Sequence, residues 1–234
     1  MEEFKNGIKA AIPIAIGYIP IALTFGLLAK SNEISFYITT LMSLLVFAGA
    51  SQFVAVNLLA LGTGTGEIIL TTFILNFRHF LMSASLSQKM AENIDKKLLS
   101  LLAFGITDET FSIASLKKNE LKPAFMLGLN LLSYLAWVVG TAAGHRGGAV
   151  LPDSLQSSMG IALYAMFIGL LVPSLKESSS ETIVALITVI VSLIFYFLSK
   201  YISLSEGWRI IIVTIISAFI GALIYSDKGG RSRV

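Results

Sequence analysis

The sequence predicts an all-α, polytopic helical membrane protein. Hydrophobic residues make up 55% of its 234 residues, charged residues make up only 13%, and the mean hydropathy is +0.82. Soluble domains carry about 25% charged residues, and uninterrupted apolar runs of about 18 residues are typical of membrane-spanning helices. Such runs fill almost the whole chain. We therefore expect one transmembrane domain over residues 1–234, multi-pass in a cell membrane.

Eight apolar segments follow one another, separated by short polar connections. They cover residues 8–29, 34–61, 67–87, 98–116, 124–144, 158–175, 182–199 and 208–225. If 98–116 re-enters on one side, most Lys and Arg of the connections share a side, as the positive-inside rule requires. We then expect seven crossings, an outer N-terminus and a cytoplasmic C-terminus. Residues 25–53 and 139–169 share an order of elements that is compatible with an inverted repeat.

Segment 8–29 carries two prolines and a glycine on one face. Pro13 and Pro20 each free a backbone carbonyl four residues earlier, which could line a path. The alternative is that Pro and Gly are simply commoner in membrane helices.

Segment 34–61 is longer than the roughly 20 residues that span a membrane. Gly49 and Ala50 stand before Ser51 and Gln52, which suggests an unwound point where Ser51 caps a half-helix. The free N–H groups of such a helix bind anions. The alternative is a long tilted helix that packs closely at Gly49.

Segment 67–87 places polar residues on one helical stripe beside an arginine. The stripe consists of Thr72, Asn76, His79, Ser83 and Ser87. Arg78 lies at its flank. Hydrogen bonds between helices would explain the hydroxyls. An Arg–His pair inside a membrane is costly, and it favours a functional site.

Segment 98–116 carries adjacent carboxylates, Asp108 and Glu109, in "GITDETF". They diverge on a regular helix, so both face one cavity only if the helix is broken there. They are the only acids that can pair with Arg78 inside the membrane. The alternative is a polar loop at the membrane edge, with Thr107 or Asp108 as an N-cap.

Later segments offer packing motifs rather than chemistry. Gly140 and Gly144 form a G-x-x-x-G pair suited to close helix contact. Asn130 and Ser133 suit hydrogen bonds between helices. We expect His145 at the segment end to be solvated. The chain has no cysteine, so disulfides and thiolate metal sites are excluded. No metal or other cofactor is expected, and no basic face with aromatics suggests nucleic-acid binding.

Five stretches resemble the AzlC family, the larger subunit of two-component branched-chain amino acid exporters. They are "GYIPIALTFGLLA" (17–29), "FAGASQF" (47–53), "NFRHFLMSASL" (76–86), "GITDETFSIA" (105–114) and "GIALYAMFIGLLVP" (160–173). The resemblance implies a bacterial inner-membrane exporter of leucine, isoleucine and valine. Some members of the family also export methionine, and the family name refers to the leucine analogue azaleucine. It also implies a small AzlD-type membrane partner and export driven by the proton motive force. Relatives often carry an acid in the sixth segment, and "GIALYAMF" has none.

Transport of a zwitterion with an apolar side chain needs three features. The carboxylate would bind Arg78 or the N–H groups near Ser51 and Gln52, and the ammonium would bind Asp108 or Glu109. The apolar chain would lie among Phe47, Phe53, Phe80 or Phe111. His79 has an ordinary pKa of about 6.5 and is the first candidate for proton coupling. Glu109, if held away from water, is the second.

Two other functions remain open from the sequence. A passive channel would need no coupling group. An intramembrane hydrolase would need a serine within reach of His79, and Ser83 is the only near one on that helix, without a nucleophile motif around it. We expect no enzymatic activity.

Overall fold

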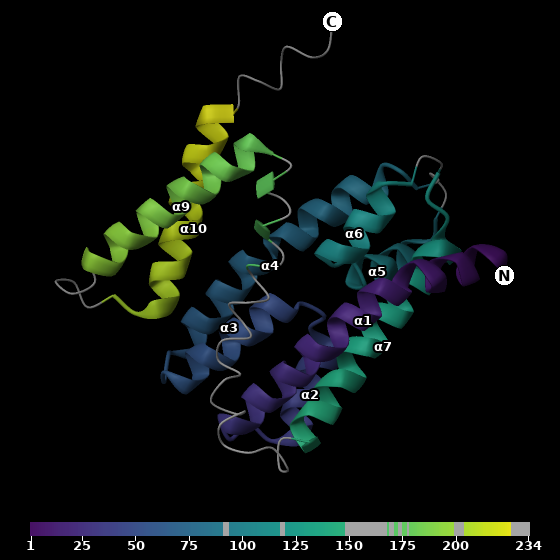
Figure 1. The fold of residues 1–234 in the computed structure, drawn as a ribbon, viewed down its shortest axis with the longest axis horizontal. Coiled ribbons are helices and arrows are strands. Elements are labelled where there is room, and N and C mark those ends of the chain that lie inside the picture. Colours follow the sequence, from purple (N-terminus) through teal and green to yellow (C-terminus); the bar gives the residue numbers. More distant parts are fainter. Residues whose placement is uncertain are drawn as a thin grey trace, which may run out of the picture. The chain divides into compact units, whose positions relative to one another are not determined.

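The computed structural model describes residues 1–90, 94–117, 120–147, 168, 171–172, 175–176, 178–198 and 204–225. Every regular element in these residues is helical, as Figure 1 shows. The chain divides into two compact units, each with more contacts within it than to the other. The first comprises residues 1–56 and 75–163, and the second comprises residues 57–74 and 164–234. Each unit is described by itself. The single domain over residues 1–234 stays a prediction.

Among the described residues, five helices are long and apolar enough to cross a membrane, or six spans if one bent pair is counted as a span. The chain is thus a multi-pass helical membrane protein, and its described residues hold slightly fewer spans than the eight apolar segments and seven crossings expected. Segment 34–61 accounts for part of the difference, because it forms two short helices. The predicted segment 158–175 and most of the second half of the sequence echo lie outside the described residues.

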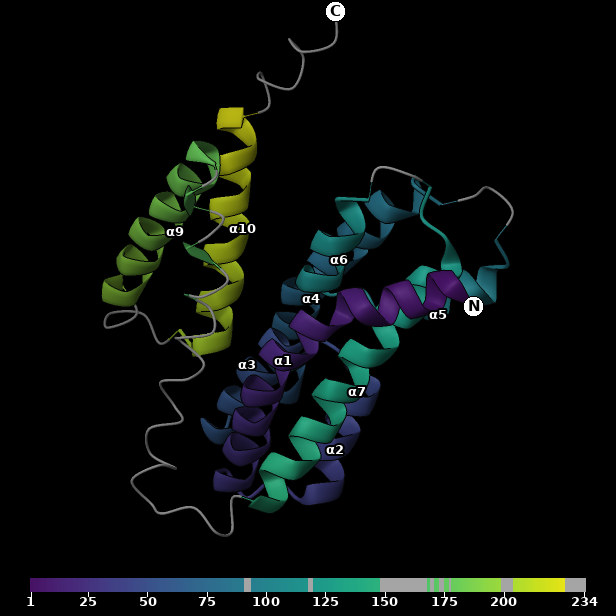
Figure 2. The ribbon, with the colours of Figure 1, turned by 45° about the vertical axis from the view of Figure 1, so that its right-hand side comes forward.

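Helices α1 (Glu2–Ser31) and α7 (Pro123–Gly147) form the core of the first unit and lie side by side in Figures 1 and 2. Glycines bring them together. A Cβ at Gly26 would lie 2.1 Å from the Thr141 carbonyl oxygen, and one at Gly144 would lie 2.1 Å from that of Leu23. The expected packing role of Gly144 is confirmed. Pro13 and Pro20 lie on the exposed face of an unbroken helix.

Helix α7 carries two further polar groups toward its neighbours. Asn130 donates from Nδ2 to the Leu102 carbonyl oxygen at 2.9 Å, which confirms a hydrogen bond between helices. The expectation of a solvated His145 is wrong. Its ring is buried, and Nε2 lies 2.7 Å from the Ile34 carbonyl oxygen, because the segment end packs against the chain after α1.

Segment 34–61 is broken, as predicted. Helix α2 (Phe36–Leu45) begins after Ser35, whose hydroxyl accepts from the Ile38 N–H at 3.4 Å. Helix α3 (Gly49–Ala60) starts after three non-helical residues, 46–48. Helix α4 (Thr65–Ser87) then follows a short turn.

Two short helices come next: α5 (Lys96–Phe104) and α6 (Asp108–Ser115). Their axes are bent by 118° at the three residues between them, the geometry of a broken span or a re-entrant loop. The bend is compatible with the re-entrant segment expected at 98–116, which stays a prediction.

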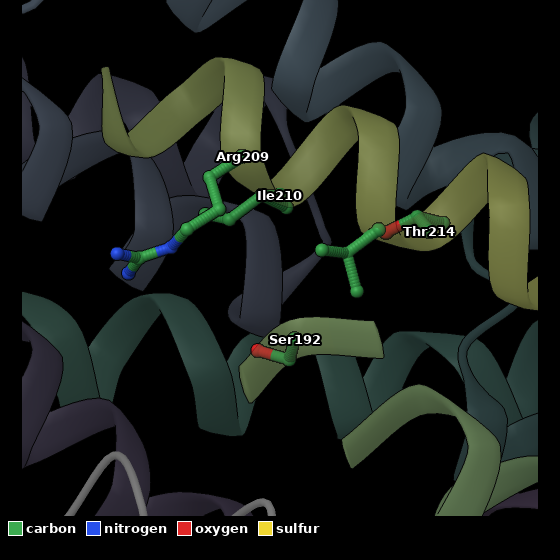
Figure 3. A pocket seen from close by; sticks show the side chains of 5 residues that line it. Ser192, Arg209, Ile210 and Thr214 are labelled. Carbon is green, nitrogen blue, oxygen red and sulfur yellow. The ribbon is translucent and has the colours of Figure 1, made fainter. Parts of the chain in front are cut away.

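The second unit is built on α9 (Ser179–Leu198) and α10 (Glu206–Tyr225) with the start of α4. Glu67 of α4 accepts hydrogen bonds from the Trp208 N–H at 2.9 Å and from the Ser205 hydroxyl. A carboxylate suits this position because helix N-termini leave N–H groups unpaired and attract negative charge. Figure 3 shows Arg209, Ile210 and Thr214 of α10 facing Ser192 of α9 across a groove of about 170 Å³.

Candidate functional site

The break between α5 and α6 is fixed by local hydrogen bonds. Thr107 caps α6: its hydroxyl accepts from the Thr110 N–H at 3.3 Å, and the Thr110 hydroxyl accepts from the Thr107 N–H at 2.8 Å. This capping box satisfies backbone groups that would otherwise be unpaired in a membrane. The break is therefore a turn held by specific hydrogen bonds, and it sets the orientation of the residues on either side of it.

Two consecutive residues of α4 hold the two sides of this break. Arg78 Nη1 lies 2.6 Å from Asp108 Oδ2, which confirms a pairing that the sequence predicts. His79 Nδ1 lies 2.8 Å from the Ile106 carbonyl oxygen. A carbonyl only accepts, so this bond places a hydrogen on Nδ1. The ion pair is half-exposed, with 40% of the Arg78 and 35% of the Asp108 side chain accessible.

Glu109 turns to a different helix. The Tyr18 hydroxyl of α1 donates to the Glu109 carboxylate and lies 2.7 Å from the Thr107 hydroxyl. The helix break does occur in "GITDETF", but it precedes both carboxylates. Asp108 and Glu109 therefore stand in the first turn of a regular helix and diverge, toward α4 and α1. The structure does not bring both to one cavity.

Ser51 and Gln52 belong to a second polar group. The expectation that Ser51 caps a half-helix is wrong: α3 begins at Gly49, and the Ser51 hydroxyl donates to the Ala48 carbonyl oxygen at 2.9 Å. Gln52 is buried, with Oε1 accepting from Trp137 Nε1 at 2.8 Å and Nε2 donating to the Ser43 hydroxyl at 3.1 Å. An amide bonded at both its nitrogen and its oxygen ties α2, α3 and α7 together.

The two polar groups meet at an aromatic cluster. The Tyr18 ring packs edge-on against Trp137, with centroids 5.5 Å apart, and against Phe47 at 6.0 Å. Sequence reasoning missed Tyr18 and Trp137, because aromatic residues are unremarkable in apolar segments. The one available signal was that Tyr and Trp carry a donor that needs a partner when buried.

Several polar atoms near the break have no partner. Among the described residues, Asn76 Oδ1, Arg78 Nε and His79 Nε2 are buried and make no hydrogen bond. Buried polar atoms are nearly always paired, with protein or with water. These three atoms, within four residues of α4, are therefore candidates for binding water or a polar ligand.

A groove lies between the C-terminal half of α4 and α5. It has a volume of about 280 Å³ and is lined by six of the residues between 80 and 90 and by five of those between 99 and 106. Of the four phenylalanines proposed for an apolar pocket, only Phe80 lines it. Phe47 and Phe53 are buried in the aromatic cluster of α1 instead. Phe111 is half-buried on α6.

The remaining polar residues of the α4 stripe face different environments. The Thr72 and Ser87 hydroxyls donate to carbonyls of their own helix, at 2.8 and 2.7 Å. Ser83 lines the groove, and the described bond of His79 is to Ile106 rather than to Ser83. No group of three or more His, Asp or Glu residues suited to a metal ion occurs in the described part of the chain.

The sequence comparisons identify the family. A family model described as AzlC protein matches residues 13–151, more than half of the chain. The chain belongs to the AzlC family. Every candidate residue, from Ser51 to Glu109, lies in the part that this AzlC model matches.

Relatives of this AzlC-family protein are membrane proteins. An uncharacterized membrane protein of Archaeoglobus fulgidus is 38% identical over 176 residues, which cover 74% of this chain and 76% of the relative. The inner membrane protein YgaZ of Escherichia coli is 33% identical over 189 residues, 78% and 77% of the two chains. The branched-chain amino acid transport protein AzlC of Bacillus subtilis is 31% identical over 168 residues, 70% and 65% of the two chains. No solved structure matches.

Proposed function

We propose that this AzlC-family protein is a secondary active exporter of branched-chain amino acids in the inner (plasma) membrane. Leucine, isoleucine and valine are its substrates, with methionine and analogues such as azaleucine as further candidates. The name of the Bacillus subtilis relative, a branched-chain amino acid transport protein, supports the substrate class. A small AzlD-type membrane subunit, implied by the family resemblance, is its partner.

The observation that carries the proposal is the half-exposed pair of Arg78 and Asp108 at the helix break. A zwitterionic amino acid has one carboxylate and one ammonium, and the pair offers the complement of both. When substrate binds, its carboxylate takes the place of Asp108 on Arg78, and its ammonium binds the released Asp108. No charge is left unpaired in the exchange, which matters because an unpaired charge in a membrane is costly.

His79 is the proposed proton-coupling group. Its Nδ1 is held by the Ile106 carbonyl oxygen, while Nε2 is buried and unpartnered among the described residues. A neutral imidazole in this tautomer has its lone pair on Nε2, which can take a proton. A proton there adds a positive charge beside Arg78. Protonation therefore strengthens the binding of the substrate carboxylate and weakens the binding of the substrate ammonium.

Efflux of radiolabelled leucine from loaded cells or vesicles tests the assignment. We expect Arg78→Ala and Asp108→Ala to lower the rate at least tenfold. Arg78→Lys should also be impaired, because an ammonium lacks the planar fork of the guanidinium. Lys122→Ala is the matched control, since Lys122 pairs with Glu3 and its side chain is 61% exposed. Normal efflux by both alanine variants would show that the substrate binds elsewhere.

The alternative functions give different results in the same assay. A proton uncoupler abolishes coupled export but leaves the flux through a passive channel unchanged. A hydrolase would alter leucine derivatives chemically, whereas an exporter releases its substrate intact. The partner is tested by repeating the efflux with and without co-expression of an AzlD-type subunit, and we expect full activity only with it.

A further inference from the structure

The groove between α4 and α5 has mostly apolar walls. Phe80, Ala84 and Leu86 form one side, and Leu99 and Ala103 form the other. Ser83, Ser87 and Ser100 also line it. Its volume is about 280 Å³, whereas a buried apolar cavity of about 150 Å³ is large enough for benzene. The space therefore accommodates a branched four-carbon chain.

Two residues that line the groove, Phe80 and Ile106, connect it to the polar residues of the helix break. Phe80 follows His79 directly, and Ile106, which also lines the groove, accepts the His79 hydrogen bond at 2.8 Å. Asp108 lies two residues further on and pairs with Arg78 at 2.6 Å. Lining residues of the groove are thus next in sequence or hydrogen-bonded to a histidine whose Nε2 has no described partner, and this histidine directly follows the arginine that pairs with Asp108.

We propose that this groove is the side-chain subsite of the transported amino acid. The backbone end of the substrate lies at Arg78, His79 and Asp108, and its apolar chain extends along α4 between Phe80 and Ala103. The inference rests on the proposed function, and it adds which surface selects the substrate. An apolar subsite distinguishes substrates that differ by a methylene by roughly tenfold or more, and it disfavours polar side chains.

Filling the groove tests the proposal through selectivity. Ala84 and Ala103 face it from opposite sides, so Ala84→Leu and Ala103→Leu shorten the space available. We expect each to lower leucine efflux at least tenfold relative to valine efflux. Ala143→Leu makes the same change on the exposed surface of α7 and should keep the wild-type ratio. The subsite is overturned if both groove variants keep the wild-type ratio of leucine to valine efflux, including the case in which the two rates fall equally.

Thiol labelling measures binding without transport. The chain has no cysteine, so a single Ser83→Cys variant places one thiol in the groove. We expect leucine to slow its reaction with a small maleimide, and serine at the same concentration not to. Ser31→Cys, at the exposed end of α1, should react equally with or without leucine.

The two readouts separate this inference from the proposed function. If leucine protects Ser83→Cys but the wild-type protein shows no leucine efflux, the groove is supported as a binding site and the exporter is refuted. Leucine efflux by that variant without any protection would support the exporter and refute the groove.

Discussion

Alanine at Gly26 should loosen the contact between α1 and α7. A Cβ there would lie 2.1 Å from the Thr141 carbonyl oxygen and 2.5 Å from the His145 backbone nitrogen, whereas ordinary contact begins at 3.4 Å. Both are backbone atoms and cannot rotate away. The two helices must therefore separate by the difference between 2.1 Å and 3.4 Å, about 1.3 Å.

The size of the effect follows from two opposing contributions. Overpacking of a tight interface costs about 1–3 kcal/mol, and replacement of a helical glycine by alanine gains up to about 1 kcal/mol. Because the clash is with backbone, we expect the upper part of that range and a net loss of about 2 kcal/mol. For a chain of this size, this lowers the Tm by about 4–8 °C.

Thermal unfolding in a mild detergent, followed at one scan rate by near-UV circular dichroism, measures the shift. Gly17→Ala is the matched control on the same helix, since no atom lies within 4 Å of its added Cβ. We expect this variant to melt at or above the wild-type temperature. If Gly26→Ala is as stable as Gly17→Ala, the close approach of α1 and α7 is wrong.

Three further predictions concern the helix break and use the same melting assay. The double variant with alanine at Arg78 and Asp108 should lose about 0.5–1 kcal/mol less stability than the sum of the two single variants, because the ion pair is half-exposed. If the losses of the two single variants simply add up, the two side chains are not coupled. Tyr18→Phe should lower the stability by about 1–3 kcal/mol, because it removes the hydroxyl bonded to Thr107 and Glu109. Tyr37→Phe, at a residue that is 78% exposed, should leave the stability unchanged. Equal melting temperatures of the two variants would contradict this role of Tyr18. Thr107→Ala should cost about 1 kcal/mol and Thr107→Ser much less, because serine keeps the cap; equal losses would rule out capping as the cause.

The sequence predicts the part of the site that electrostatics demands. Arg78 needs an anion inside the membrane, and Asp108 and Glu109 were the only acids available at similar depth. Which of the two pairs with Arg78 depends on where α6 begins, and the capping box at Thr107 decides this by starting the helix at Asp108.

The parts that sequence reasoning missed depend on weak or tertiary preferences. The break near Gly49 was predicted from segment length, but the choice of Ser51 as its cap relied on a preference of only about 1 kcal/mol, which the local backbone overrides. Tyr18 and Trp137 bond to Glu109 and Gln52 across long stretches of sequence. No local pattern encodes such contacts.

The pairing of α1 with α7 has a consequence for membrane insertion. Gly7 of α1 packs against the chain at Phe125, so more than a hundred residues must be synthesised before the first helix meets its main partner. At about 5–20 residues per second, this takes roughly 6–24 s. For most of that time the Tyr18 hydroxyl, which later bonds to Glu109, has no partner because α6 is not yet synthesised. The nascent first helix must therefore wait among lipids or on an insertion factor, and a chain truncated before α7 should be a target for membrane proteases.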